Sequence, residues 1–410
     1  MDALLLLAWR NIWRHRRRTL INMSAVGLGL FLIITYSGLI GGVLGDAKNQ
    51  LDNIGMGHIE ISTPAWRLKH GAGMVLAAPA ALLARLALPP GAEVGVRVVA
   101  RGLLTSPRGG VGVTIHGIDS AREPAVARYA GDIREGAQLA PDDVHGIVIG
   151  DELATRLRVR LGHKVRIMVQ RADGEMGAAL YRVRGIFHAV VPAIARSRVL
   201  VTTAAAEELL GIGDAAHQIV IQLGRVDDAE PVAARLRAEL GAGYDVATYG
   251  QLLPVLKALE GLQNGVVVVM ALFVYLLVGL GILNTTLMSV FERTREFGVM
   301  RALGNRPRQI VALVVAEAFW IASVSVAAGL VLGLAVTWIG SEHTLLDFGQ
   351  IFGESMQIGG AVIRSALRTE YSLTNGLKAS AIVYVLTLGV GLYPAWRISR
   401  LPPAEALRAS

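Results

Sequence analysis

Four long apolar runs divide this 410-residue chain into parts suited to a bilayer and parts suited to water. The runs cover residues 19–43, 264–290, 309–339 and 374–394. A helix rises 1.5 Å per residue, so about 20 apolar residues cross a hydrocarbon core of about 30 Å. The hydrophobic pattern therefore predicts four transmembrane helices.

The segment between the first two runs, residues 44–263, has the pattern of a water-exposed domain. Short apolar stretches bounded by Gly or Pro predict strands at 57–61, 94–99, 111–115, 147–149, 165–169, 180–187, 199–201, 219–223 and 245–247. Apolar residues at spacings of three and four predict helices at 79–86, 151–157, 204–210, 229–240 and 251–259. The fold class expected is a four-helix membrane protein with a large extracytoplasmic α+β domain, in two lobes, inserted between helices 1 and 2.

Residues 1–18 predict an amphipathic basic helix at the membrane surface. Trp9 and Trp13 suit the headgroup level, and the arginines among them, ending in Arg16–Arg18, suit an anionic leaflet. A secretory signal is the competing interpretation of the N-terminus. The first apolar run exceeds the usual core of such a signal and lacks a clear cleavage site, so we expect a retained anchor.

Arginine clusters predict the orientation of the chain. They occur in residues 1–18, in the loop 291–308 and in the tail 395–410, which the positive-inside rule places in the cytoplasm together with both termini. The segments 44–263 and 340–373 then lie outside.

Composition excludes several classes of function. The net charge of +8 comes with no nucleic-acid motif, so we expect no nucleic-acid partner. The chain has no Cys, its nine His residues show no metal-ligand spacing, and adjacent acidic pairs such as Asp142-Asp143 point apart. No phosphate loop and no nucleophile elbow occur. We therefore expect no catalytic residue, no metal and no cofactor on this chain.

The loop 291–308 has the content of a short surface helix. Its apolar residues fall near one face, Gly304-Asn305 supplies a stop, and Pro307 favours the start of the next helix. A basic connector between two spans is the alternative interpretation. If the loop instead contacts a partner, its charged and apolar side chains are the candidates, namely Glu292, Arg293, Arg295, Glu296, Phe297 and Met300.

Two motifs carry a resemblance to a known family. The strings Glu292-Arg-Thr-Arg-Glu-Phe-Gly-Val-Met-Arg-Ala-Leu-Gly304 and Pro394-Ala-Trp-Arg-Ile-Ser-Arg-Leu-Pro-Pro-Ala-Glu-Ala-Leu-Arg408 resemble the coupling segment and C-terminal signature of the FtsX/MacB/Lol-type (type VII) ABC transporter permeases. The phrases Ala8–Arg14 and Gly150–Ile167 are similar to family passages. Gly57–Ile61 is similar to a passage of the lipoprotein-releasing members.

The resemblance implies a mechanotransmitting permease subunit of a bacterial inner (cytoplasmic) membrane. Its expected partners are a cytoplasmic ABC ATPase dimer that binds ATP and Mg, a second permease (identical or homologous), membrane lipids, a periplasmic carrier and acylated protein cargo. Lipoprotein release is the preferred function. The alternatives are export of a drug or peptide through an outer partner, ATPase-driven regulation of an extracellular hydrolase, and an ATP-independent sensor.

Depth in the membrane suggests where cargo acyl chains would enter. Near the outer ends of the first and second spans, the candidates are Leu30, Ile34, Leu262, Val266 and Met270. Ordinary helix packing is the alternative for each. Glu317, an acid within the third apolar run, is expected to pack or hydrogen-bond rather than to transfer protons.

Overall fold

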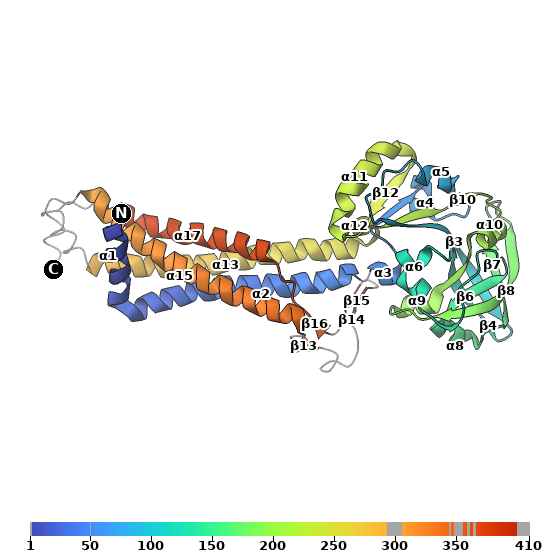
Figure 1. Cartoon of the computed structure of the whole chain (residues 1–410), viewed down its shortest axis with the longest axis horizontal. Helices are drawn as coiled ribbons and strands as arrows, with labels where there is room; N and C mark the ends of the chain where they lie inside the picture. The colour runs from blue at the N-terminus through green and yellow to red at the C-terminus, as the bar shows by residue number, and fades with distance from the viewer. Residues whose placement is uncertain are drawn as a thin grey trace. The chain divides into compact units, whose positions relative to one another are not determined.

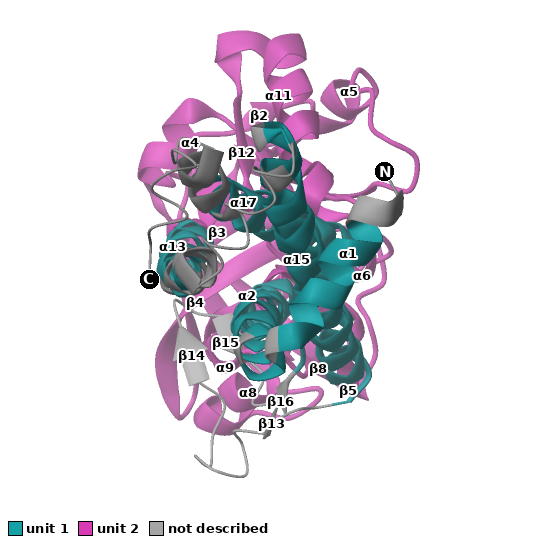
Figure 2. Cartoon of the chain, turned by 90° about the vertical axis from the view of Figure 1, so that its left-hand side faces the viewer, with its two compact units in different colours: residues 1–45, 260–354, 365–410 teal, residues 46–259, 355–364 magenta. Residues whose placement is uncertain are grey.

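The computed structural model describes residues 2–49, 51–292, 306–343, 346–347, 356–358, 361–363 and 366–399. The chain forms two compact units, coloured separately in Figure 2. Unit 1 comprises residues 1–45, 260–354 and 365–410, and unit 2 comprises residues 46–259 and 355–364.

Unit 1 is helical, as the apolar runs predict. Its elements, labelled in Figure 1, are α1 (Asp2–Ile12), the 3-10 turn η1 (Trp13–His15), α2 (Arg16–Asn49), α13 (Pro254–Glu292), α15 (Pro307–Glu342) and α17 (Leu373–Ser399). Within the described residues, four helices are long and apolar enough to cross a membrane, over Thr19–Ile54, Pro254–Gly281, Val311–Glu342 and Leu373–Val390. The four-helix membrane fold is therefore confirmed.

The N-terminal helix ends earlier than residue 18. α1 stops at Ile12 and η1 follows, so the basic residues Arg16–Arg18 begin α2. The hydroxyl of Thr19 donates to the carbonyl of Ile12 at 2.8 Å, which satisfies one of the carbonyls that a helix end leaves without a partner.

Helix α1 is fixed against α15 by polar and aromatic contacts. Asn11 Nδ2 donates to Glu317 Oε1 at 2.6 Å, and Trp320 Nε1 donates to the carbonyl of Leu5 at 3.2 Å. The rings of Trp9 and Trp320 lie 5.0 Å apart in an edge-on arrangement. Glu317 thus has the hydrogen-bonding role expected for it.

Helices α2 and α15 approach closely because glycines line their crossing. A Cβ at Gly329 would lie 2.6 Å from the carbonyl oxygen of Gly27, and one at Gly333 would lie 2.9 Å from Cβ of Ile34. Small residues permit such close helix contact in membranes. The crossing supports a core of Val26, Leu30, Ile34, Val326 and Val383.

Unit 2 contains a ten-stranded mixed sheet with the path β12-β1-β11-β3-β4-β9-β6-β8-β5, and β7 pairs with β3 and β8. The ten strands of this sheet are β1 (Ile59–Ser62), β3 (Glu93–Ser106), β4 (Gly109–Ile118), β5 (Ile133–Gly136), β6 (Gly146–Gly150), β7 (Lys164–Gln170), β8 (Met176–Phe187), β9 (Arg198–Thr202), β11 (Gln218–Gln222) and β12 (Asp245–Thr248). Strands β2 (Leu76–Ala77) and β10 (Ala215–Ala216) pair with each other in a separate two-stranded sheet.

Helices and turns cover this sheet. They are α3 (Leu51–Ile54), α4 (Pro64–Lys69), α5 (Pro79–Leu83), α6 (Glu123–Val126), α7 (Arg128–Gly131), α8 (Asp151–Leu157), α9 (Pro192–Ser197), α10 (Thr203–Leu210), η2 (Val226–Asp228), α11 (Ala229–Leu240), η3 (Gly241–Gly243) and α12 (Tyr249–Leu252). Four short strands lie in the segment before α17: β13 (Leu346–Asp347), β14 (Met356–Ile358), β15 (Ala361–Ile363) and β16 (Ala366–Leu367).

Strand β3 joins two lobes within unit 2. Its first part, Glu93–Arg97, pairs with β11, and from Val98 onward it pairs with β4 instead. One lobe has an apolar core that includes Ile59, Ile219 and Leu236, and the other is built on cores around Ile147 and Phe187. The α+β class and the two lobes agree with the sequence prediction.

Most predicted elements of unit 2 lie within observed ones, and α8 and α11 have the predicted ends. The strands β3, β4 and β8 are longer than predicted, because glycines and polar residues interrupt their apolar pattern. The helix expected over 251–259 is divided between α12 and the start of α13, since Pro254 begins a new helix.

Candidate functional site

A cavity of about 440 Å³ lies among the helices of unit 1. Residues at helical spacing from α2, α13 and α17 line it, so each helix presents one face to the cavity. The lining comprises Ile33, Ile34, Ser37, Gly38, Val267, Val268, Ala271, Leu272, Tyr275, Thr337, Glu370, Ser372, Asn375, Gly376, Ala379 and Ile382. We call it the span pocket.

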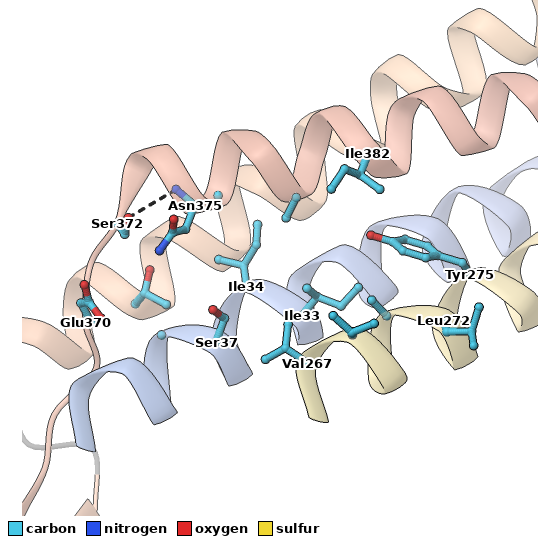
Figure 3. A pocket seen from close by; sticks show the side chains of 16 residues that line it. Ile33, Ile34, Ser37, Val267, Leu272, Tyr275, Glu370, Ser372, Asn375 and Ile382 are labelled. Carbon is cyan, nitrogen blue, oxygen red and sulfur yellow. Dashed lines mark hydrogen bonds between the residues drawn. The ribbon is translucent and has the colours of Figure 1, made fainter. Parts of the chain in front are cut away.

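The span pocket is amphipathic along its length. Figure 3 shows Glu370, Ser372 and Asn375 at one end, while Leu272, Tyr275 and Ile382 lie toward the other. Ser372 caps α17, since its hydroxyl accepts from the backbone N–H of Asn375 at 3.3 Å. The polar end therefore sits where the last helix of the unit begins.

Thr369 and Glu370, at the polar end, are held by hydrogen bonds to backbone carbonyls of α15 and α2. Thr369 Oγ1 donates to the carbonyl of Thr337 at 2.6 Å, and its N–H donates to the carbonyl of Gly340 at 3.0 Å. The N–H of Glu370 donates to the carbonyl of Gly38 at 2.7 Å. Buried non-helical backbone needs such partners in an apolar environment.

Gly38 makes this arrangement possible. A Cβ on Gly38 would lie 2.6 Å from Cγ2 of Thr337 and 3.1 Å from the carbonyl oxygen of Glu370. These distances are shorter than van der Waals contact, so a larger residue would push α2 away from this wall of the span pocket.

The described lining of the span pocket suits binding. It is largely aliphatic, no His lies beside the hydroxyls of Ser37 and Ser372 among the described lining residues, and Glu370 is the carboxylate among them. An apolar cavity with a few convergent polar groups suits an amphiphilic ligand.

Of the cargo-contact residues suggested by depth, Ile34 lines the span pocket. Leu30 is buried in the helix core and lines a smaller neighbouring cavity. Leu262, Val266 and Met270 lie on α13 but are not among the lining residues. Depth alone cannot choose between neighbouring residues, because consecutive helix residues point about 100° apart.

Sequence reasoning missed the contribution of the C-terminal helix. Asn375, Ala379 and Ile382 recur at spacings of four and three, so they share one face of α17, and Gly376 adjoins Asn375 at its edge. That spacing, with polar Asn375 at its start, was the feature of the sequence from which the contribution of α17 could have been predicted. Glu370 had no comparable signal, because it lies before the helix begins.

The proposed coupling residues fall mainly outside the described part of the chain. Helix α13 ends at Glu292, of whose side chain the structure says nothing. The remaining candidates, Arg293, Arg295, Glu296, Phe297 and Met300, lie outside the described residues. Helix α15 begins at Pro307 as expected, and the backbone N–H of Arg306 donates to Gln309 Oε1 at 2.8 Å.

Comparison with protein families identifies the class of protein. Residues 19–239 match the MacB-like periplasmic core domain, and residues 268–403 match the FtsX-like permease C-terminal domain. The chain therefore belongs to the FtsX-like permeases with a MacB-like periplasmic core, the type VII ABC transporter permeases. It is a multi-pass membrane permease component.

Individual proteins and structures are similar to parts of this chain. The chain is 23% identical over 304 residues to the lipoprotein-releasing system transmembrane protein LolC of Xylella fastidiosa, covering 72% of each chain. It is 28% identical over 174 residues to the macrolide export ATP-binding/permease protein MacB of Syntrophobacter fumaroxidans, covering 42% of this chain and 21% of that protein. The solved periplasmic region of MacB from Actinobacillus actinomycetemcomitans matches with a TM-score of 0.35 and 12% identity, covering 50% of this chain and 95% of that one.

Proposed function

We propose that this chain is a permease subunit of an ABC transporter that moves acylated proteins out of the inner membrane. A separate cytoplasmic ATPase dimer binds ATP and Mg²⁺ and supplies the energy. The permease transmits the resulting movement to its periplasmic domain, which passes the cargo to a carrier. Both termini and the loop 291–308 lie in the cytoplasm.

The observation that carries this proposal is the span pocket. Its volume of about 440 Å³ falls within the range of about 300–1,000 Å³ typical of ligand sites. Its aliphatic walls suit an acyl chain, whose burial contributes about 0.8 kcal/mol per methylene. Glu370 and Asn375 at one end suit the polar backbone of a lipidated N-terminus.

The family and the sequence support the proposed need for an ATPase partner. The relatives are ABC transporter permeases, and this chain has no phosphate-binding loop of its own. The loop 291–308 connects α13 directly to α15, and α13 contributes a wall of the span pocket. A force on the loop would therefore act on the pocket through one continuous helix.

A second permease would complete the transmembrane unit. Helix α13 exposes large apolar side chains along its length, among them Val269, Phe273, Leu276 and Leu280. None of its membrane-spanning window is buried within the described chain. A two-fold partner, identical or homologous, would cover this face and bring a second coupling loop to the second ATPase.

Photocrosslinking tests the proposal. A diazirine amino acid at Val267, in the span pocket, should capture an acylated protein when the complex is assembled in cells. The amount of this crosslinked adduct should decrease when ATP is hydrolysed. The matched control is the same probe at Val385, which is 67% exposed on α17 and does not line the pocket. Capture of phospholipid alone at both positions would contradict cargo binding.

Export of a drug or peptide is the second candidate. It is favoured by the match of residues 19–239 to the MacB-like periplasmic core and by the MacB relatives. The same experiment separates the two functions. An exporter should yield adducts with a small amphiphile or peptide at Val267, and its activity should depend on an outer partner rather than on a soluble carrier.

A further inference from the structure

A second cavity, of about 300 Å³, lies within unit 2 against one face of the sheet. We call it the domain cavity. On β3, the side chains of Val98 and Ala100 belong to an apolar core, although Ala100 also borders the cavity. Arg97, Val99 and Arg101 alternate with them and line the cavity. Side chains alternate across a strand, so one face of β3 supports the core and the other faces the cavity.

Strand register places a hydroxyl between two guanidinium groups. Thr114 of β4 is opposite Arg101 of β3 on one side and opposite Arg198 of β9 on the other. Opposite residues in neighbouring strands share a face of the sheet, and all three line the domain cavity. Three neighbouring strands therefore each contribute a hydrogen-bond donor to the same side of the cavity.

His116 adds a buried group without a partner. It is 4% exposed, it lines the domain cavity, and its Nδ1 has no hydrogen-bond partner among the described residues. Burial, and then the charges of Arg198 and Arg97, hold the pKa of His116 well below its usual value, so its ring is neutral. Buried polar atoms normally find a partner, which here a ligand can supply.

Two of the arginines are fixed in place. Arg97, which is 1% exposed, lies 2.6 Å from Glu123 through Nη2 and Oε1. Arg198 Nη1 donates to the carbonyl of Ile54 at 2.7 Å and to Tyr129 Oη at 3.1 Å. These bonds occupy one nitrogen of Arg198 and hold its guanidinium in position.

The charge of the lining favours an anion. The lining contains three arginines and one carboxylate: Arg97, Arg101 and Arg198, with Glu60. Burial raises the pKa of Glu60, and Arg67 and Arg97 partly oppose that shift. Even if Glu60 is ionised and Arg97 is neutralised by Glu123, the charges of Arg101 and Arg198 exceed the single negative charge of Glu60.

We propose that the domain cavity binds an oxyanion, the phosphate or carboxylate group of a small molecule or of a lipid headgroup. Arg101 and Arg198 supply charge-assisted hydrogen bonds, Thr114 donates its hydroxyl, and His116 contributes an N–H. The lining includes Gln218 of one lobe and Arg198 of the other, so the bound anion bridges the two lobes across β3. This site is independent of cargo binding in the span pocket.

Thermal unfolding of the full chain in a neutral detergent tests the site, with sodium phosphate and sodium acetate as probes and sodium chloride at equal ionic strength as reference. A ligand that binds only the folded state raises Tm in a saturable way. The variants Arg101→Gln and Thr114→Val should raise the apparent Kd at least tenfold. Arg101 is exposed, so its replacement should leave the fold intact. The matched control is Arg160→Gln, an exposed arginine of the same domain outside the cavity lining.

Native mass spectrometry distinguishes the two sources of the anion. If the ligand is a lipid headgroup, the wild-type chain from phosphatidylglycerol nanodiscs should carry one more lipid than Arg101→Gln, with no such difference in phosphatidylcholine. A non-saturable Tm rise, equal in wild type and Arg101→Gln, would reflect only the general effect of kosmotropic salts. That result together with equal lipid counts would overturn the proposal, whereas either saturable binding or the extra lipid supports it.

Discussion

Filling the span pocket should weaken cargo binding without unfolding the protein. Ala271 lines the pocket from α13, and Ala271→Phe would place a phenyl ring in a space of about 440 Å³. A ring that displaces about four methylenes of a bound acyl chain removes about 3 kcal/mol of burial at about 0.8 kcal/mol each. Since about 1.4 kcal/mol is a factor of ten, the Kd should rise about 100-fold.

The measurement is the Kd of a fluorescent diacylated lipopeptide for the purified permease complex in nanodiscs. Val385→Phe is the matched control, because it adds the same ring at an exposed position of α17 that does not line the pocket. Equal affinity of Ala271→Phe and wild type would refute the assignment of the pocket to cargo. Equal loss in both variants would point to a general effect of the added ring on the membrane helices instead.

Three further predictions concern coupling, pH and topology. Glu296→Lys should weaken ATPase association by roughly 2–5 kcal/mol. Gly298→Pro should break the short helix that the sequence predicts for the loop and uncouple hydrolysis from transport. Pull-down and transport assays that match wild type for both variants would remove the coupling role. Burial, with nearby arginines, lowers the pKa of His116, so the unfolded state binds more protons than the folded state below about pH 6.5. As the pH decreases below that value, the free energy of unfolding should decrease by up to about 1.4 kcal/mol per pH unit. Denaturation measured at about pH 7 and about pH 5.5 should show a smaller decrease in the free energy of unfolding for His116→Asn than for wild type, and an equal decrease would contradict this. A cysteine at Gly174 should react with an impermeant thiol reagent added from the outer side of the inner membrane and one at Asn305 should not, and the reverse pattern would invert the topology.

The sequence alone determined the class of fold and the order of its parts. Apolar runs long enough to cross a bilayer need no tertiary partner to be identified, because their length and composition are local properties. The helices α8 and α11 were predicted with their observed ends for the same reason, since their caps and spacing are local. The family motifs at residues 292–304 and 394–408 also required only the linear order of residues.

Tertiary structure decided which residues meet. The span pocket combines Ile34 of α2, Ala271 of α13 and Asn375 of α17, and their convergence depends on helix rotation and on the close approach that Gly38 permits. The domain cavity likewise depends on the register that sets Thr114 between Arg101 and Arg198. The turn between β3 and β4 sets the first of these registers, whereas the second depends on the pairing of β4 with β9, about 80 residues further along the chain. Periodicity along the sequence indicates which face a residue takes but not which strand lies beside it.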